Sequence, residues 1–394
     1  MTRKITLIYV DSGGGHRAAA TALREVIRRQ DRPWDVEMVC TQDIFNPIDF
    51  IRSYTGIPFQ DVYNIMLRRG WTLGSAHMIR AMHLLIRMSH GSQVGAMRRY
   101  WAQSRPDLVV SLIPHFNRSI KQALHGVWPG VPYVTLLTDI ADYPPHFWME
   151  RDLDGGARYV ICGSARAASQ AHEIGIGADR ILRASGMILN PKFYEPLNVD
   201  RDAELTRLGL RPGVPTGLVL FGGEGSNEML KIAVALNRSR TPVQLILLCG
   251  KNERVAAKLG AMDTRVPMFV QGFTRDVPFY MELADFFIGK PGPGSISEAL
   301  AKRLPVIVQR NAWTMADERY NADWVGDQGA GLVVRNFGGE ICGAVEKLLA
   351  PENYARFRQR AADLRNQAVF EIPDMLEKIL AESAHEMPRI LTTV

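Results

Sequence analysis

The chain has 394 residues, of which 46% are hydrophobic and 22% are charged. This length suits two domains, and the composition excludes disordered and fibrous proteins. No run approaches the ~20 apolar residues of a membrane-spanning helix, and the N-terminal apolar stretch is too short for a signal peptide. The four cysteines form no CxxC pair, so we expect free thiols in the cytoplasm.

The formal net charge of +6 is unevenly distributed. Residues 1–199 contain 23 basic and 17 acidic side chains, whereas residues 200–394 contain 24 of each. Residues 45–125 alone carry ten basic and three acidic side chains. Such an excess suits nucleic acid, an anionic membrane surface or phosphorylated ligands, and charge alone does not choose among them.

Short apolar runs alternate with helical patterns along the chain, which predicts buried parallel strands. In the first half the predicted strands are Ile5–Val10, Val36–Cys40, Asp107–Leu112, Tyr133–Thr138 and Tyr159–Cys162. In the second half they are Gly217–Phe221, Val243–Leu248, Met268–Val270, Asp285–Ile288, Pro305–Val308 and Gly331–Val334. Two such series indicate two doubly wound α/β domains, with residues 1–196 in the first and the second beginning at 197.

The segment Phe45–Trp101 departs from this alternation. It is basic, mostly helical in pattern and rich in methionine and aromatic residues, which suits a membrane interface. The residues we expect at the membrane are Arg68, Arg69, Trp71, Arg80 and Arg87. The alternative is an amphipathic helix pair packed on the first sheet, with its arginines in water.

A glycine loop follows the first strand of each predicted domain. Asp11–His16 has three consecutive glycines before a helix, and Phe221–Ser226 repeats the arrangement in the second domain. Glycines let backbone N–H groups approach a ligand closely, and the helix N-terminus favours an anion. Neither loop has the GxGxxG or GK[ST] spacing, so a dinucleotide cofactor and an NTPase are disfavoured. The alternative for each loop is a tight turn.

The segment Lys290–Glu298 has the sequence KPGPGSISE after an apolar strand. Two Pro-Gly pairs make a rigid loop suited to a diphosphate, and the predicted helix Ser295–Arg303 places Glu298 in its first turn. The Glu298 carboxylate could there accept two sugar hydroxyls, or it could form a capping box with Ser295. Further on, Asp317–Asn321 offers polar side chains for a sugar, or plain charges at a helix start.

Together these residues resemble the glycosyltransferase family of the monogalactosyl- and monoglucosyl-diacylglycerol synthases and, more distantly, the MurG-type transferases. The resemblance runs from Gly13 to about Val334. It is carried by GGGHRA from Gly13, Thr138-Asp139, GGEG from Gly222, KPGPGSISEAL from Lys290, and Glu318 with Asn321. It implies a GT-B fold, with two facing Rossmann-like domains and an interdomain cleft. It also implies that a final helix in residues 367–394 returns to the first domain, which leaves 197–366 as the second.

The resemblance also implies roles for individual residues. His16 and Asp139 would be catalytic, with Gly14, Gly15 and His115 on the acceptor side. Glu298 would bind the ribose, while Glu318 and Asn321 would meet the donor sugar. The residues expected around the diphosphate are Gly222, Gly223, Gly225, Ser226, Gly292, Gly294 and Ser295. No metal or other cofactor is expected, and no DxD motif lies near the diphosphate positions.

Two departures from the family pattern concern the donor side. Asp317-Glu318 stands where the family usually has Gln-Glu, so galactose and glucose both stay open. Pro291 replaces the small residue expected after Lys290, which stiffens the loop. Thr138-Asp139 could also be an ordinary helix start, which makes Asp139 the weaker of the two catalytic assignments.

We therefore expect an inverting hexosyltransferase that acts from a UDP-sugar on diacylglycerol, peripherally on the inner face of the cell membrane. One alternative is a GT-B transferase that uses UDP-N-acetylglucosamine or another UDP-sugar on a polyprenyl, ceramide-like or small hydrophobic acceptor. Others are a UDP-sugar 2-epimerase and a non-enzymatic binding module. Nucleic acid is disfavoured as a partner, because the basic residues alternate with methionine and aliphatic residues.

Overall fold

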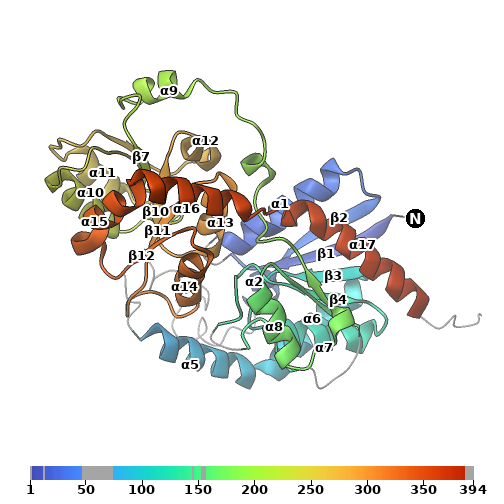
Figure 1. Ribbon diagram of the computed structural model, residues 1–394. Helices are drawn as coiled ribbons and strands as arrows, with labels where there is room; N and C mark the ends of the chain where they lie inside the picture. The colour runs from blue at the N-terminus through green and yellow to red at the C-terminus, as the bar shows by residue number, and fades with distance from the viewer. Residues whose placement is uncertain (1, 12–13, 47–73, 144–145, 152–156, 387–394) are drawn as a thin grey trace, which may run out of the picture. The chain divides into compact units, whose positions relative to one another are not determined.

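The computed structural model describes residues 2–11, 14–46, 74–143, 146–151 and 157–386. The chain divides into two units (Figure 1). The first unit contains the described residues of 1–63, 76–190 and 367–394, and the second contains those of 64–75 and 191–366.

The first unit is built on a six-stranded parallel sheet with the strand order β2-β1-β3-β4-β5-β6. The strands are β1 (Arg3–Tyr9), β2 (Trp34–Cys40), β3 (Leu108–Ser111), β4 (Tyr133–Leu136), β5 (Arg158–Cys162) and β6 (Ile181–Arg183). Every residue of β3, β4 and β5 is buried, as expected for the centre of a sheet covered on both faces. The sequence did not predict β6, because three partly exposed residues at a sheet edge make no apolar run.

Helices surround this first sheet, and the last of them comes from the end of the chain. They are α1 (Gly15–Arg29), α2 (Thr41–Phe45), α5 (Ser75–Met88), α6 (His90–Gln103), α7 (Asn117–Val127), α8 (Ala165–Glu173) and α17 (Ala368–Glu386). Helix α17 packs against α1 (Figure 1). Arg32 pairs with Asp374 and, at 2.7 Å, with Glu377, and the Ser185 backbone N–H donates to Glu371 at 2.8 Å.

The second unit repeats this architecture with the strand order β12-β11-β10-β7-β8-β9, again all parallel. The strands are β7 (Thr216–Leu220), β8 (Gln244–Leu248), β9 (Met268–Gln271), β10 (Phe286–Gly289), β11 (Val306–Gln309) and β12 (Gly331–Val334). The helices are α9 (Arg201–Arg207), α10 (Glu228–Arg238), α11 (Glu253–Gly260), α12 (Val277–Glu282), α13 (Pro293–Ala301), α14 (Arg319–Gln328), α15 (Phe337–Leu349) and α16 (Pro351–Asp363). Two doubly wound parallel sheets confirm the predicted fold class.

The described residues of Phe45–Trp101 form two helices that differ in burial. On α6, Met97 and Trp101 are completely buried against β3 and α7, as in an ordinary core. On α5, Leu84, Leu85 and Met88 are 60%, 47% and 75% exposed. The described helices therefore include both a core-forming segment and an apolar surface.

This difference in burial predicts that the same substitution has a large effect on stability at one methionine and a small effect at another. Met97→Ala leaves a cavity in the core and should lower the free energy of unfolding by about 2–5 kcal/mol. Met88→Ala removes an exposed side chain and should change it by about 0.5 kcal/mol or less. Guanidinium-induced unfolding of both variants measures the difference, and equal effects would contradict the assignment of Met97 to the core.

Candidate active site

The second sheet has its topological switch point between β10 and β7. The chain passes from β7 to β8 and β9 on one side and from β10 to β11 and β12 on the other. Ligands of such sheets bind outside the carboxyl ends of the strands at this point. The Phe221–Ser226 loop follows β7, and the loop from Lys290 follows β10, so the structure brings both predicted phosphate loops to the switch point.

Lys290 connects these loops with the predicted sugar motif. Its Nζ lies 2.6 Å from Oε1 of Glu318, which is largely buried. A Cβ on Gly222 would come within 3.6 Å of the Lys290 side chain, and one on Gly292 within 3.4 Å. Asn321 is buried, and its Nδ2 donates to the Pro291 carbonyl at 2.9 Å. The two motifs that the sequence singled out thus form one cluster, whose charges and loop geometry stabilise each other.

The glycine loop after β7 packs backbone against backbone on the loop after β8. Gly225 has a φ of +63°, and a Cβ there would lie 2.3 Å from the Cys249 carbonyl oxygen. Gly250 has a φ of +58°, and a Cβ there would lie 2.3 Å from the Gly223 carbonyl oxygen. Only glycine fits both the left-handed conformation and this approach. The Ser226 hydroxyl accepts from the Glu228 N–H at 3.2 Å, so it belongs to the turn into α10.

Helix α13 begins earlier than the sequence predicted. Gly292 is its N-cap and Pro293 its first residue, so Glu298 lies in the second turn and the predicted start at Ser295 is wrong. No side chain caps the helix, which also rules out the capping box between Ser295 and Glu298. The backbone N–H groups of Gly294 and Ser295 fall in the first turn, where no helical carbonyl accepts from them. They are therefore available to an anion.

Glu298 is a carboxyl group without a protein donor. No described residue donates a hydrogen bond to it, and burial raises its pKa to about 7. Desolvation penalises the ionised form, and nothing nearby compensates for it. A ligand that brought hydroxyl groups to this carboxylate would supply the missing donors.

The first sheet has its switch point between β1 and β3. His16 follows β1, His115 follows β3, and Thr138 with Asp139 follows the next strand, β4. The predicted catalytic and acceptor-side histidines therefore come from the carboxyl ends of neighbouring strands. Gly14 takes a φ of +80° as the N-cap of α1, and Gly15 is exposed behind it. Residues 137–143 are not helical, so the alternative interpretation of Thr138-Asp139 as a helix start is wrong.

His16 has a neutral imidazole in this setting. Burial lowers its pKa to about 4, and a hydrogen bond with the Leu112 backbone opposes this shift only partly. Its Nδ1 lies 3.0 Å from the Thr138 hydroxyl, and its ring packs 5.7 Å from that of Trp148. Asp139 accepts a hydrogen bond from the Trp148 indole at 2.7 Å. Asp139 thus holds the Trp148 indole in place, and the His16 ring packs against that indole.

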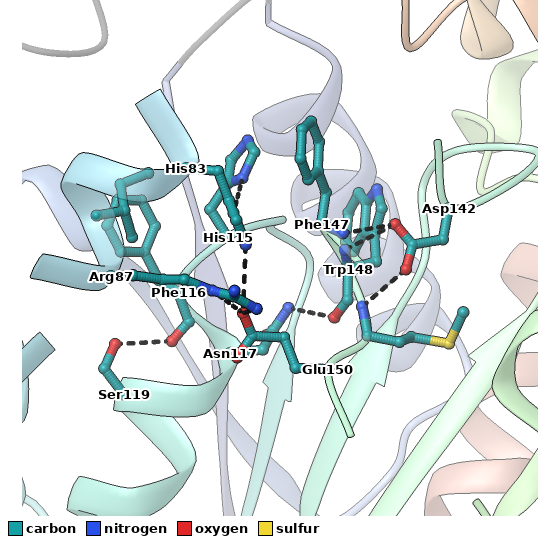
Figure 2. Close-up of polar contacts among 12 residues, drawn as sticks. His83, Arg87, His115, Phe116, Asn117, Ser119, Asp142, Phe147, Trp148 and Glu150 are labelled. Carbon is teal, nitrogen blue, oxygen red and sulfur yellow. Dashed lines mark hydrogen bonds and ion pairs between the residues drawn. The ribbon is translucent and has the colours of Figure 1, made fainter. Parts of the chain in front are cut away.

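Asp142 and Trp148 are site residues that the sequence analysis missed. The buried Asp142 carboxylate accepts hydrogen bonds from the backbone N–H groups of Phe147, Trp148 and Met149 at 2.8, 3.0 and 3.1 Å (Figure 2). The Asn117 amide donates to the Trp148 carbonyl at 3.0 Å. These bonds hold the turn that presents Trp148 to His16. No pattern in the sequence predicts them, because Asp142 follows no strand directly and caps no helix.

The predicted membrane residues are only partly within the described chain. Arg68, Arg69 and Trp71 lie outside the described residues. Arg80 is exposed on α5, and Arg87 is about half exposed and pairs with Glu150 at 3.1 Å. Lys121, counted in the basic segment, is buried and adds nothing to a surface.

Two kinds of feature are absent from the described residues. No helix there is long and apolar enough to cross a membrane. No three His, Cys, Asp or Glu side chains of that part of the chain gather closely enough to hold a metal ion.

Comparison with known proteins defines the class. Residues 218–369 match the glycosyltransferase family 28 C-terminal domain. MurG from Acinetobacter baumannii superimposes with a TM-score of 0.62 at 14% identity, covering 95% of this chain and 99% of that one. A MnaA–UDP structure from S. aureus gives 0.62 at 16% identity, covering 98% and 99%. The protein is a glycosyltransferase with the GT-B fold.

Similar sequences identify the family more narrowly than the fold does. Probable monogalactosyldiacylglycerol synthase 2 from Oryza sativa subsp. indica is 31% identical over 353 residues, which span 84% of this chain and 70% of that protein. The chain belongs to the monogalactosyldiacylglycerol synthase family.

The raised pKa of Glu298 predicts a pH-dependent stability. Between the ordinary value of 4.5 and about 7, the native state keeps a proton that the unfolded chain has released. Stability from this group therefore falls as pH rises through that window. Glu298→Gln should lack this loss, so its melting temperature should gain on that of the wild type as pH rises to about 7.

Thermal melts of both proteins across that pH range measure the gain. The exposed Glu253 provides the control, since Glu253→Gln should follow the wild-type profile in the upper part of the window. Parallel profiles for the wild type and Glu298→Gln would contradict the assignment.

Proposed function

We propose that this protein transfers a hexose from a UDP-sugar to the free hydroxyl of diacylglycerol, with inversion at the anomeric carbon and without a metal ion. The observation that carries the proposal is the cluster at the second switch point, where two glycine loops meet Lys290, Glu318 and Asn321. Family membership supports it, since the rice relative is named for galactosyl transfer to diacylglycerol. The MnaA structure of the same fold contains UDP.

The second unit offers groups for each part of a UDP-sugar. Free first-turn amides of α13 and the amides of the β7 loop suit the diphosphate. The unpartnered Glu298 carboxylate suits the two ribose hydroxyls. Phe273, which follows β9 and is 55% exposed, provides a ring on which the uracil could stack. Glu318 and Asn321 are fixed by Lys290 and Pro291, so their remaining oxygens can meet the sugar without reorganisation.

The first unit supplies the base. The acceptor oxygen attacks the anomeric carbon, the bond to UDP breaks with its electron pair on the diphosphate, and Nε2 of His16 takes the hydroxyl proton. This requires the tautomer in which Nδ1–H donates to Thr138 at 3.0 Å. Loop amides and the helix N-terminus of α13 stabilise the charge that develops on UDP.

A transfer assay tests this function. Purified protein is incubated with diacylglycerol in mixed micelles and with UDP-galactose, UDP-glucose, UDP-N-acetylglucosamine or UDP-glucuronate in turn. We expect a monohexosyl-diacylglycerol, identified by mass, from one of the first two donors, with the β-configuration from an α-linked donor. Turnover should persist in EDTA. Transfer from UDP-N-acetylglucosamine alone, or no transfer from any donor, would contradict the proposal.

A variant pair tests the base in the same assay. His16→Ala should lower turnover by about 100-fold or more, the range of a general base, while UDP binding measured by calorimetry stays unchanged. His172 on α8 is exposed in the same unit, and His172→Ala is the control. Near-normal turnover in His16→Ala would assign the base to another group.

We further propose that α5 attaches the protein to the inner face of the cell membrane. Its apolar face, formed by Leu84, Leu85 and Met88, is largely exposed, and the exposed Arg80 lies on the same helix. Apolar insertion beside a cation is the pattern of a reversible interfacial helix, at about 1 kcal/mol for each basic residue near an anionic surface. A lipid acceptor requires such attachment.

Liposome flotation tests this surface. The triple variant Leu84→Ser/Leu85→Ser/Met88→Ser should lose more than about 10-fold in membrane partition, since each buried side chain contributes roughly 1.5–3 kcal/mol. Val333 in the second unit is 39% exposed, and Val333→Ser is the control. Turnover of a short-chain, water-soluble diacylglycerol should persist in the triple variant. Unchanged flotation of the triple variant would exclude α5 as the attachment surface.

A further inference from the structure

Four titratable side chains near His16 form a chain of contacts that the proposed mechanism does not use. Nε2 of His83, on α5, lies 3.4 Å from Oε1 of Glu150. Nδ1 of His83 lies 3.4 Å from Nδ1 of His115 (Figure 2). Arg87, one turn further along α5, binds the same Glu150 oxygen at 3.1 Å. The order is therefore Arg87, Glu150, His83 and His115, from the exposed side inward.

His115 is held in an unfavourable backbone conformation at the inner end. Its φ is +71°, in the left-handed region that non-glycine residues rarely adopt and that costs about 1–2 kcal/mol. Its N–H donates to the Phe147 carbonyl at 2.5 Å, and the Phe147 ring packs on both imidazoles, 4.5 Å from His115 and 5.1 Å from His83. Strain of this kind concentrates at functional positions.

The position of His115 in the sheet is that of a ligand-binding residue. It follows β3, while His16 follows β1, and the switch point of the first sheet lies between these two strands. Phe147 contacts His115, and its neighbour Trp148 contacts His16. The turn fixed by Asp142 therefore positions both imidazoles.

The contacts determine which nitrogen carries each proton. The Glu150 carboxylate can only accept, so Nε2 of His83 donates to it and Nδ1 of His83 has a lone pair. Nδ1 of His115 must then be the donor in the pair, which leaves a lone pair on its Nε2. No described residue binds that Nε2. Burial, with His83 and His16 nearby, lowers the pKa of His115 to about 3, which agrees with a neutral ring.

We propose that Glu150, His83 and His115 form a proton relay for the acceptor site. The inference rests on the proposed function. Nε2 of His115 takes the proton that the acceptor hydroxyl has lost, handed on by His16. His115 releases its Nδ1 proton to Nδ1 of His83, and the positive charge rests beside Glu150. One N–H bond forms and one breaks on His115, so its charge returns to zero. His115 is the catalytic member, and His83 and Glu150 are positioning residues.

The relay complements the chemistry of His16. A base whose pKa is about 4 holds an abstracted proton weakly at neutral pH. His115, whose pKa is about 3, only passes the proton on, and it comes to rest on His83 beside the Glu150 carboxylate. The titratable groups next to the relay are Arg87 at its outer end and the neutral His16 at its inner end. Contacts with His83 and Arg87 lower the pKa of Glu150, although burial opposes this, so the carboxylate is ionised when the proton arrives.

Glu150→Gln is the decisive variant, because an amide keeps the size of the side chain and can reverse the tautomers. The amide N–H would donate to Nε2 of His83, whose Nδ1–H would then donate to His115 and place a proton on the wrong nitrogen. The analogous change in the serine-protease triad lowers kcat by about 10⁴-fold through the wrong tautomer. Here we expect kcat to fall by about 10- to 100-fold with KM for the donor unchanged, at the lower end of general acid–base contributions.

Kinetics, stability and NMR together test the relay. The acid limb of the pH–rate profile should move to lower pH in Glu150→Gln, because no carboxylate then stabilises a protonated imidazole. His115→Gly should lose more turnover than its folded fraction explains, while its stability reflects two opposing effects, relief of the left-handed strain and loss of packing on Phe147. His90 on α6 is also half-buried and contacts Gln122 at 2.6 Å, so His90→Gln is the matched control.

Wild-type kcat and pH profile in Glu150→Gln would overturn the relay, as would turnover in His115→Gly that falls only in proportion to its folded fraction. Imidazole ¹⁵N shifts provide a readout without turnover. They should show Nε2–H on His83 and Nδ1–H on His115, reversed in Glu150→Gln, and any other pattern overturns the relay. A wild-type protein that shows these tautomers but transfers no sugar would instead disprove the proposed function.

Discussion

The reversal of strand order at the centre of each parallel sheet is the constraint on which the functional chemistry depends. At β1/β3 and at β7/β10, neighbouring strands send the following chain to opposite sides of the sheet. Their carboxyl ends are therefore open to a ligand, and helix N-termini point toward it. Except for Phe273, which follows the edge strand β9, every group to which we assign a role in transfer comes from a loop or helix that follows these strands or their neighbours. The central strands contribute mostly buried side chains to the core.

In the second unit, an ion pair and a hydrogen bond hold the polar groups at this opening in fixed positions. Lys290 pairs with Glu318, and Asn321 secures the Pro291 carbonyl, so the loop after β10 is held by the helix after β11. Breaking such a pair would leave a largely buried carboxylate without compensation, which costs more than the pair itself gains. Glu298 is the opposite case, because burial raises its pKa to about 7 and no residue in the described part of the chain donates a hydrogen bond to it. One carboxylate holds the cluster together, and the other is buried with no donor among the described residues.

The sequence predicted the sheets well because the buried strands are apolar runs with clear ends. Eleven strands were placed to within two residues at each end, and β6 was missed because three half-exposed residues give no such run. Motifs with local spacing, such as Lys290–Glu298, were also found from the sequence. The sequence did not predict the roles of Asp142 and Trp148 or the contact of His83 with His115. The contacts of these residues depend on one turn and on residues that are distant in the chain. Even within a motif found from the sequence, the predicted helix start at Ser295 was wrong, and the start of α13 at Pro293 rules out the alternative of a capping box.

The strained backbone of His115 and the burial of His16 can be explained together. A neutral imidazole is a useful base only if its proton has somewhere to go, and the low pKa of His16 makes this requirement acute. The left-handed backbone of His115 destabilises the fold unless its contacts compensate. Those contacts lead through His83 to the ionised Glu150 carboxylate. Because His83 lies on α5, the helix with the exposed apolar face also carries the middle member of this chain. An exposed apolar surface and a largely buried chain of polar contacts therefore share one helix of the first unit.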